Sequence, residues 1–442
     1  MPATYLTMDG LLKDVYPKIM TKVLNNQVLA LNKASHRKRT FEGRQAKFPA
    51  HVGRNLSARA LVPGGSLAAA GNQKTVQWTV PIKAIFPHIR LTSDIMARTK
   101  SSAGAFARAL AFETEGSMDD VKRLANRICW GQGDGVVALV TSYTAPAGVP
   151  TPVLRAYDSA AQGHINAYAG ARHIRVGDVI DIYSPAGVVK LTGCTVATAT
   201  YATNTLTLTP GTVSAAPVSG DYVFLSNPDG LNQITDPSAP FEQMGYGGII
   251  DDGTFVDTLM GLSRTTYPLL KSQKIAAGTY GALGTLTQEL VQRLEDLRRN
   301  AGAAPQGNII CHTSVRLKYL ATVVTDRRYT TAYEYKAGIK ENMDDKNPKS
   351  SLYFNEMQWH TDVDAPYYTL YMIPDEGPEF FEMVPLRPID DGGGMLKLIP
   401  GTAGMFAVVY EWHWNLGPNE LGPNRYGRMD FINATPDAFI PA

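Results

Sequence analysis

The stretch GRNLSARALVPGGSLAAAGNQ, residues 53–73, decides the fold, and it lies between two segments with strand character. It holds three Leu residues, no aromatic residue and no acidic residue, together with many Gly, Ala and Ser residues. It is too long for a hairpin turn and too polar to form a core of its own. Long connections of this kind are uncommon inside compact domains and are usually functional or disordered. Its role therefore has to come from the rest of the chain.

The two flanking segments predict a β-hairpin. AKFPAHV (46–52) predicts a short strand, and KTVQWTVPIKAIF (74–86) predicts a long one. From Val76 to Lys83, apolar residues alternate with Thr, Gln and Lys, which is the period-two pattern of a half-buried antiparallel strand. We therefore predict that 53–73 is the tip of a long hairpin arm, ordered mainly when it lies on a partner.

The charge of the chain is divided unevenly along its length. The net charge is +2, from 42 Lys and Arg residues and 40 Asp and Glu residues. Residues 1–110 hold 17 basic and 4 acidic residues, or +13, so the remainder holds 25 basic and 36 acidic residues, or −11. A basic segment is typical of nucleic-acid binding. The acidic remainder favours instead a basic arm of one copy on the acidic body of another, because complementary potentials steer association.

Composition excludes several classes of protein. The three cysteines lie far apart, which predicts buried thiols in a reducing compartment and neither a disulfide framework nor a metal site. The N-terminus lacks the apolar core of a secretory signal, and no apolar run approaches the ~20 residues that span a bilayer. With 28 Pro, 40 Gly and 44% hydrophobic residues, the chain is expected to be a soluble, β-rich protein with a sizeable core.

Apolar spacing predicts four helices along the chain. The first, 8–35, is expected to kink at Pro17, and it is followed by HRKR at 36–39. This basic cluster is either a solvated helix end or a contact with nucleic acid or a partner. A long helix is expected at 103–130. The last two helices are expected at 285–301, with a capping box of Thr285 and Gln288, and at 314–324.

Two regions are predicted to be rich in strands. From 136 to about 228 the chain is dominated by Thr, Val, Ala, Gly and Ser, and two of its predicted strands begin with the turn residues Gly177-Asp178 and Gly220-Asp221. This pattern predicts an inserted small barrel or sandwich. Further strands are expected in NIICH (308–312) and in five segments between 352 and 433: LYFNEMQW, YYTLYMI, MLKLI, MFAVVYEWHW and RYGRMDFI. Helices and strands mix without a regular repeat, which indicates an α+β fold.

No catalytic constellation emerges from the sequence. There is no HExxH motif, no Walker A motif and no GxSxG elbow, and GQGDGV (131–136) follows a helix rather than the strand a dinucleotide loop requires. Four groups of acidic residues are expected to be turn formers or helix caps rather than cation ligands: Asp251-Asp252, Asp344-Asp345, Asp362 with Asp364, and Asp390-Asp391. We expect no catalytic residue, no cofactor and no metal, as in a structural subunit.

The order of the parts resembles the major capsid proteins of tailed bacteriophages with the Hong Kong 97-type fold. Three stretches carry the resemblance. The arm tip resembles the extended loop of one branch of that family. GGIIDDGTFVDTLMGLSRTTYP (247–268) resembles the return into the peripheral and axial domains. The helix at 285–301, NIICH and TDRRYT (325–330) resemble the axial domain. In the tip, the residues concerned are Gly53, Arg54, Asn55, Gly64, Ala70 and Gly71.

The resemblance implies an α+β capsid fold with an N-terminal arm, an extended β-hairpin loop, a spine helix, peripheral and axial domains, and an inserted small all-β domain. The implied divisions are the N-terminal arm at 1–40, the extended loop at 41–92 with its tip at 53–73, the peripheral domain with the spine helix at 93–135, the inserted barrel or sandwich at 136–228, the return to the peripheral domain at 229–284, the axial domain at 285–400, and the closing strands of both domains at 401–442.

The resemblance also implies a function. Copies would form hexamers and pentamers of an icosahedral head around double-stranded DNA, assembled in the host cytoplasm and found in the virion. The expected loop contacts with a neighbouring subunit are Gly53, Arg54, Asn55, Arg59, Leu61, Leu67 and Gly71. The candidate contacts with DNA or a partner are Arg37, Lys38 and Arg39.

Expected partners are other copies of the chain, a separate scaffolding protein, a portal and a decoration protein, with no membrane. The scaffold is expected to be separate because the arm begins almost at Met1. The inserted domain is expected outside the shell. The tip contains no Lys, so no covalent crosslink from this loop is expected.

Three other functions stay open. An encapsulin-like compartment would share the fold class and enclose proteins. A tail or baseplate protein would also accommodate the β-rich middle. An enzyme acting on polysaccharide would use the inserted domain as a binding module, with paired carboxylates whose spacing cannot be read from sequence. The order of loop and spine helix favours the capsid over the tail or baseplate protein.

Overall fold

The structure is a computed structural model of the chain, and it divides into two compact units that are described separately. The first comprises Ile85–Arg123 and Leu386–Trp412, and the second comprises Val28–Ala84, Leu124–Pro385 and His413–Ala442. The residues that the structure describes are 28–55, 57–67, 69–98, 109–145, 148–154, 170–226, 242–279, 282–326, 339–340, 351–375, 377–390, 396–401, 404–420 and 422–434.

The first unit pairs short strands around the start of β23 (Met405–Gly417). β5 (His88–Thr92) and β22 (Lys397–Leu398) are both antiparallel to β23, and β5 is followed directly by α3 (Ser93–Arg98). The buried side chains of β5 alternate with exposed ones, so one face of the strand supplies the small core of this unit. That core consists of Ile89, Leu91, Val408 and Tyr410, with Leu110, Met118, Leu386 and Leu396 packed against it.

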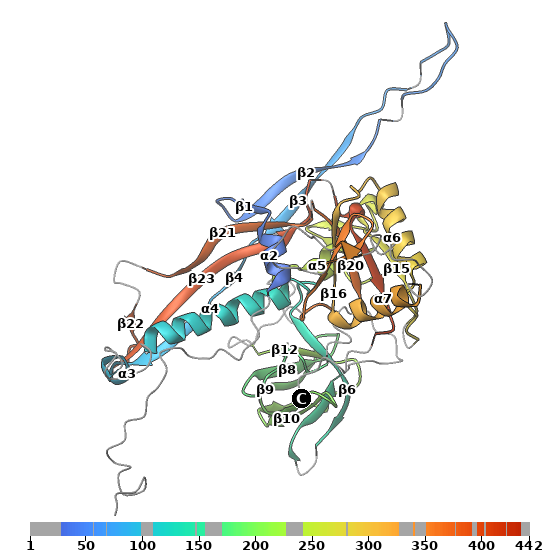
Figure 1. Cartoon of the computed structure of the whole chain (residues 1–442). Helices are drawn as coiled ribbons and strands as arrows, with labels where there is room; N and C mark the ends of the chain where they lie inside the picture. The colour runs from blue at the N-terminus through green and yellow to red at the C-terminus, as the bar shows by residue number, and fades with distance from the viewer. Residues whose placement is uncertain are drawn as a thin grey trace, which may run out of the picture. The chain divides into compact units, whose positions relative to one another are not determined.

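The long predicted helix is present as α4 (Ala109–Ile128), visible in Figure 1 as the longest helix. It continues without a break through Gly116, and the turn at Trp130 and Gly131 ends it. Residues 103–108 of the predicted helix lie outside the described residues. Of the helix expected at 8–35, the described part is α2 (Leu29–Ser35).

In the second unit, the predicted hairpin arm is confirmed as β2 (Gln45–Gly53) and β3 (Lys74–Pro81), which are antiparallel from Gln45↔Pro81 to Gly53↔Lys74. The strand predicted for 74–86 is interrupted at Ile82 and resumes as β4 (Lys83–Ile85). The second half of HRKR belongs to a strand, β1 (Lys38–Thr40), which runs parallel to β21 (Glu379–Pro388).

The main core of the second unit forms around a seven-stranded sheet in the order β15-β24-β20-β16-β19-β18-β17. β16 lies in the middle, parallel to β19 and antiparallel to β20. The strands are β15 (Gln273–Ala276), β24 (Gly427–Asp430), β20 (Leu370–Pro374), β16 (Gly307–Cys311), β19 (Met357–Thr361), β18 (Ser351–Phe354) and β17 (Ile339–Lys340). The central strands are apolar because both of their faces are buried.

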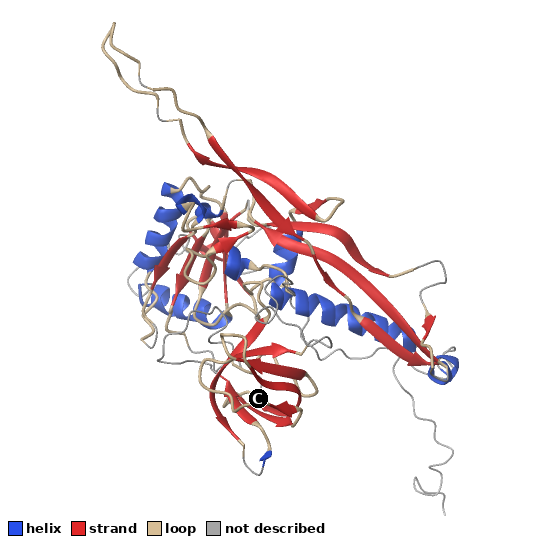
Figure 2. Ribbon diagram, turned by 180° about the vertical axis from the view of Figure 1, so that it is seen from behind, coloured by secondary structure: helices blue, strands red, loops and turns tan. Residues whose placement is uncertain are grey.

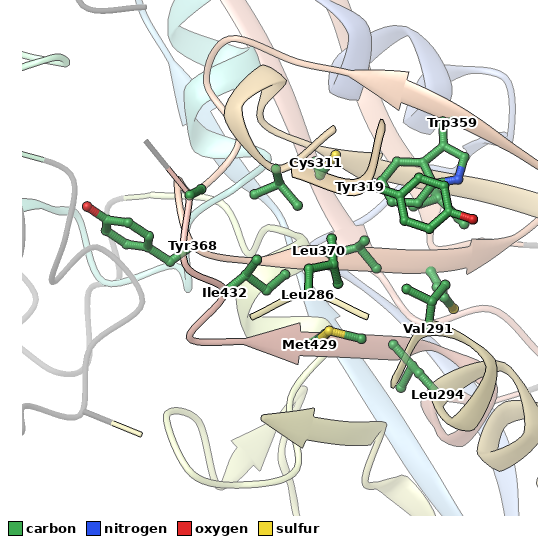
Figure 3. Packing of buried hydrophobic residues seen from close by; sticks show 14 of the residues in the cluster. Leu286, Val291, Leu294, Cys311, Tyr319, Trp359, Tyr368, Leu370, Met429 and Ile432 are labelled. Carbon is green, nitrogen blue, oxygen red and sulfur yellow. The ribbon is translucent and has the colours of Figure 1, made fainter. Parts of the chain in front are cut away.

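Helices α6 (Gln288–Asn300) and α7 (Thr313–Asp326) supply the rest of this core. Val291 and Leu294 of α6 pack with Leu370 and Met429 of the sheet (Figure 3). On the α7 side, the Tyr319 ring stacks on Trp359 with centroids 4.5 Å apart. The resulting layer of helices and sheet is the part that the resemblance assigned to the axial domain.

Two predictions about this region are corrected by the structure. The helix cap is Thr287 rather than Thr285, because Thr287 has the extended backbone and its side chain accepts a hydrogen bond from the Leu290 N–H. The chain before it is held extended, since the Gly284 N–H donates to Phe431 and the Gly284 carbonyl accepts from Asn433. The second correction is β21, a ten-residue strand that was not predicted.

The predicted inserted β-domain is a closed barrel. Its strands follow the order β10-β7-β6-β12-β8-β9, and β9 pairs back with β10 to close the ring, while the short β11 extends along β9 (Figures 1 and 2). The strands are β6 (Val136–Thr144), β7 (Thr151–Leu154), β8 (Val179–Tyr183), β9 (Val189–Thr200), β10 (Thr205–Thr209), β11 (Thr212–Val213) and β12 (Tyr222–Leu225). Full closure removes most sheet edges.

The two Gly-Asp pairs form the same turn in front of two barrel strands. Gly177 and Gly220 both have φ near +94°, a conformation that glycine adopts without strain. In each turn the aspartate side chain accepts a hydrogen bond from the N–H three residues earlier, at 2.7 Å for Asp178 and 2.8 Å for Asp221. These turns start β8 and β12, as their sequence predicts.

Arg172 fastens the barrel to the loop after β19. Its guanidinium donates to the carbonyls of Asp364, at 2.9 Å, and Ala365, at 2.8 Å. The same group lies over the ring of Tyr367, 4.2 Å from the centroid. A cation with two carbonyl acceptors and an aromatic face is a specific contact, since no single one of these partners would fix the guanidinium plane.

Candidate assembly interface

The base of the hairpin arm is packed and its tip is exposed. Trp78 and Val80 of β3 are buried, and Phe48 of β2 faces Trp78 across the hairpin with ring centroids 6.3 Å apart. Beyond Gly53 and Lys74 the two strands end, and the tip continues away from the sheet without further strand pairing among its described residues (Figure 2). The buried base therefore fixes where the tip begins, and the tip has no core of its own.

The hydrogen bonds among the described residues of the tip lie within the hairpin. The side chain of Asn55 accepts from the Ser57 N–H at 2.8 Å, and the Val62 carbonyl accepts from Gly65 at 2.9 Å in a turn where Gly64 has φ +84°. At the root of the tip, the His51 Nε2 and the Gln73 Oε1 are hydrogen-bonded at a distance of 2.6 Å. These bonds shape the loop, and for its described residues they all stay within the hairpin.

The tip presents large apolar side chains to solvent. Leu61 is 48% exposed, Val62 is 76% exposed and Leu67 is 88% exposed. Single exposed apolar residues are ordinary, but three on one projecting loop form a surface suited to burial against another molecule. Arg54 and Arg59 lie along the same loop, and it contains no acidic residue. The tip is thus basic and exposes three large apolar side chains.

The basic run at 36–39 lies against acidic residues of the same chain. Lys38 forms an ion pair with Glu382, and Arg39 binds Glu379 at 3.0 Å and Glu420 at 2.7 Å. The hydrogen bond to Glu420 raises the pKa of Arg39. These contacts hold β1 on β21, so two of the four basic side chains have partners within the chain. His36 caps α2, and the Arg37 carbonyl accepts from the Phe380 N–H at 2.9 Å.

A groove of about 580 Å³ lies beside the base of the arm. Residues 50–54 and Trp78 line one side of it, and Leu269, Glu420 and Arg425 line the other. Leu269 is 58% exposed there, although it is a large apolar residue. No local sequence pattern predicts this groove, because residues 269 and 420 are brought together only by the fold.

The buried titratable groups in the described part of the chain form ion pairs and hydrogen bonds that support the fold. Asp251 is fully buried and lies 3.7 Å from Arg264, Lys274 and Arg428. Asp362 is buried as well, and it accepts hydrogen bonds from Asn126 and from the Ala30 N–H. Burial lowers the pKa of His312 to about 3 and that of His360 to about 4.

Burial has the opposite effect on the thiols, because it raises the pKa of Cys129, Cys194 and Cys311. Among the described residues, no group of three or more His, Cys, Asp or Glu side chains is placed to hold a metal ion. Residues 344, 345 and 391, which belong to two of the predicted acidic pairs, lie outside the described part. Within the part described, no helix combines the length and the apolar character needed to cross a bilayer.

Comparison with known proteins gives no match by sequence and a clear match by fold. No protein-family model matches the chain, and no curated protein does. The fold is that of capsid shell subunits, which confirms the predicted α+β capsid fold. It is similar to the capsid asymmetric unit of cyanophage A-1(L), with a TM-score of 0.56 and 12% identity over 97% of this chain and 99% of that one.

A second structure, the capsid of the native GTA particle, aligns with a TM-score of 0.50 and 8% identity over 97% of this chain and 99% of that one. A holo-SrpI encapsulin complex from Synechococcus elongatus PCC 7942 gives a TM-score of 0.43 at 7% identity, over 98% of this chain and 96% of that one, a similarity too low to carry an argument. At these identities the similarity defines the fold, and the function has to be argued from the interface.

Proposed function

We propose that the chain is the major capsid protein of a tailed phage, whose copies assemble through the hairpin arm into a closed shell. The observation that carries the proposal is the arm itself, with a buried base and an exposed, apolar and basic tip, on a fold shared with phage capsid subunits. A loop of this kind buries little apolar area against its own chain. Burying it against a neighbour would remove apolar area from water, at about 25 cal/mol per Å².

In this proposal the contacts with the neighbouring subunit are made by the tip. Leu61 and Leu67 supply apolar area, and Arg54 and Arg59 meet an acidic surface of the next copy. Gly53, Asn55 and Gly71 shape the loop. The acidic excess of residues 111–442 supplies the complementary charge, and such charge pairs contribute more to registration and association rate than to affinity.

The shell is proposed to consist of hexamers and pentamers and to enclose double-stranded DNA without reading its sequence. Of the basic run, Arg37 is the proposed contact with DNA or a partner, because Lys38 and Arg39 form ion pairs within the chain. A separate scaffolding protein, a portal and a decoration protein are the further proposed partners. No catalytic role is proposed, and assembly would take place in the host cytoplasm.

Electron microscopy of the purified chain tests the proposal, alone and after co-expression with the products of its neighbouring genes. Closed polyhedral shells or rings of capsomers are expected, with DNA inside shells purified from infected cells. A monomer that forms no assembly in either preparation contradicts the proposal. Shells that contain only protein cargo would instead support an encapsulin-like compartment. Mass spectrometry of denatured shells is expected to show single-chain mass only, since the tip has no Lys.

A further inference from the structure

One segment of the barrel is nearly without charge. Of the 39 residues from Ile182 to Gly220, Lys190 is the only charged one, whereas 19% of the whole chain is charged. The segment covers β9, β10 and β11 with their turns, and a large part of it is at the surface. Protein surfaces ordinarily carry interspersed charges that keep molecules apart, so the absence of charge here marks a surface suited to contact.

Of five exposed valines in the described part of the barrel, three lie at one end. Val188 is 57% exposed, Val213 is 50% exposed and Val218 is 56% exposed. The strand pairing places them together. β8 ends at Tyr183, directly opposite the start of β12 at Tyr222, so the turns holding Val188 and Val218 lie at the same end. Val213 pairs with Leu191, just after the first of these turns.

The opposite end of the barrel is the attached one. Val136 at the entry of the chain pairs with Phe224 at its exit, and Arg172 makes its contacts with Asp364 and Ala365 there. Val176 is 63% exposed at this end, in the turn before β8. The valine end is therefore the free end of the barrel, directed away from its own attachment.

The free end also carries an open sheet edge. β11 pairs with β9 on one side, and in the part of the chain that the structure describes no strand pairs with its other side. Residues 211–216, GTVSAA, are all exposed. Proteins usually protect such an edge with a charged side chain, an inward-pointing charge or a bulge. None of these six residues is charged, so no charge on the edge opposes pairing with another strand.

We infer that the free end of the barrel binds the same end of a second copy, by antiparallel pairing of the two β11 edges with their valines packed alongside. Two identical antiparallel edges match under a two-fold rotation, which is the symmetry of an isologous contact. Lys190 is the only charged residue of this segment, and it is half-buried, so the surface carries little charge that would repel a second copy or attract a charged partner. The inference rests on the proposed function, because the shell brings copies of the chain together.

A cysteine scan of the full chain tests the inference in assembled shells. Residues 212–215 are replaced one at a time: Thr212→Cys, Val213→Cys, Ser214→Cys and Ala215→Cys. Directly opposed residues of an antiparallel pair have Cα atoms about 4.5–5.5 Å apart, which is within disulfide range. The three native cysteines are buried and do not compete. Val176→Cys at the attached end is the matched control.

With oxidised glutathione, at least one of the four positions is expected to give a disulfide-linked dimer in most of the chains. The yield of dimer is expected to fall at the neighbouring positions. Val176→Cys is expected to stay monomeric. Shells of normal yield without crosslinking at any of the four positions overturn the inference and leave the proposed function intact. Equal crosslinking of Val176→Cys also overturns it. If the parent chain forms no shells, the proposed function fails first and the inference fails with it.

A charge placed on the edge gives a second test that does not depend on crosslinking geometry. Val213→Lys is expected to lower the temperature at which shells dissociate, by several degrees relative to the parent, because two like charges would meet across the two-fold contact. Val176→Lys adds the same charge at a similarly exposed position and is expected to leave that temperature unchanged. Equal dissociation temperatures for the two variants would contradict self-pairing and leave a separate partner as the occupant of this end.

Discussion

Phe48 in β2 lies parallel to Phe381 in β21, with ring centroids 5.8 Å apart and 7° between the ring planes. This stack joins the base of the arm to the strand that also holds β1. The Gly417 backbone lies so close to the Phe381 ring that an added Cβ would come within 2.7 Å of it. The arm therefore starts from a fixed and tightly packed base, and the position of its tip depends on that packing.

The first prediction concerns the apolar side chains of the tip. Leu67→Asp is expected to abolish shell formation while leaving the unfolding temperature of the free subunit within about 1 °C, because Leu67 is 88% exposed and contributes little to the fold of its own chain. Negative-stain microscopy and a thermal melt measure the two effects. Leu317→Asp on α7, at 48% exposure, is the control and is expected to assemble. A folded Leu67→Asp chain that assembles normally would contradict the interface.

The second prediction concerns the charge of the tip. Arg54→Glu with Arg59→Glu is expected to slow assembly at least tenfold at low salt, because the tip would then repel an acidic surface. Light scattering measures the rate. Since exposed charges are screened beyond a Debye length of about 8 Å at physiological salt, the defect is expected to shrink as salt is raised. A double variant that assembles at the parent rate at low salt would show that these charges do not register the loop.

Much of the fold can be predicted from sequence patterns that span only a few residues. The arm follows from the alternation through Trp78 and Val80, and the barrel strands follow from turns at Gly177 and Gly220, since each signal lies within a few residues. β21 was missed because its first four residues, Glu379 to Glu382, are all buried and show no alternation. The strand at Lys38 was missed for a related reason, since its partners Glu379 and Glu382 lie more than 300 positions away.

The third prediction concerns the attachment of the barrel. Arg172→Ala is expected to destabilise the junction by about 2–3 kcal/mol, since it removes a charged donor from two carbonyls and a cation from the Tyr367 ring. Limited proteolysis is expected to cut the chain near the barrel faster than in the parent. Arg175→Ala, an exposed arginine three residues on, is expected to change the rate little. Equal cleavage of the two variants would argue against the contact as a fastening.

The fourth prediction distinguishes two positions for a helix cap. Thr287→Ala is expected to cost about 1 kcal/mol of unfolding free energy, because the Leu290 N–H loses its acceptor. Thr285→Ala is expected to cost less than about 0.5 kcal/mol, since this exposed residue precedes the helix by three positions. Urea unfolding of both variants measures the difference. A larger loss at Thr285 would restore the capping box that the sequence indicated.

The fifth prediction concerns acid. Burial lowers the pKa of His312 to about 3 in the folded chain, against about 6.5 when unfolded, so the unfolded chain binds a proton more readily in that window. Stability is therefore expected to fall as pH drops below 6.5, by on the order of 2 kcal/mol at pH 5. His312→Gln should lose less stability than the parent between pH 7 and pH 5, as measured by urea unfolding at both values.

The control for this acid sensitivity is His88→Gln, which replaces an exposed histidine. Between pH 7 and pH 5 it is expected to lose as much stability as the parent. Equal acid sensitivity of the parent and His312→Gln would assign the effect to other groups. Burial also lowers the pKa of His360, to about 4, so part of the sensitivity is expected to survive in the His312 variant.

The pairing of Val136 with Phe224 has a consequence for how such a chain can change over time. Because the barrel begins and ends on adjacent strands, the rest of the fold is connected across it as if by a short turn. An exchange of the whole module would leave that junction in place, and so would its loss or its replacement by a longer one. Variation in size, surface and binding preference can therefore accumulate in this module while the rest of the fold stays under separate constraint.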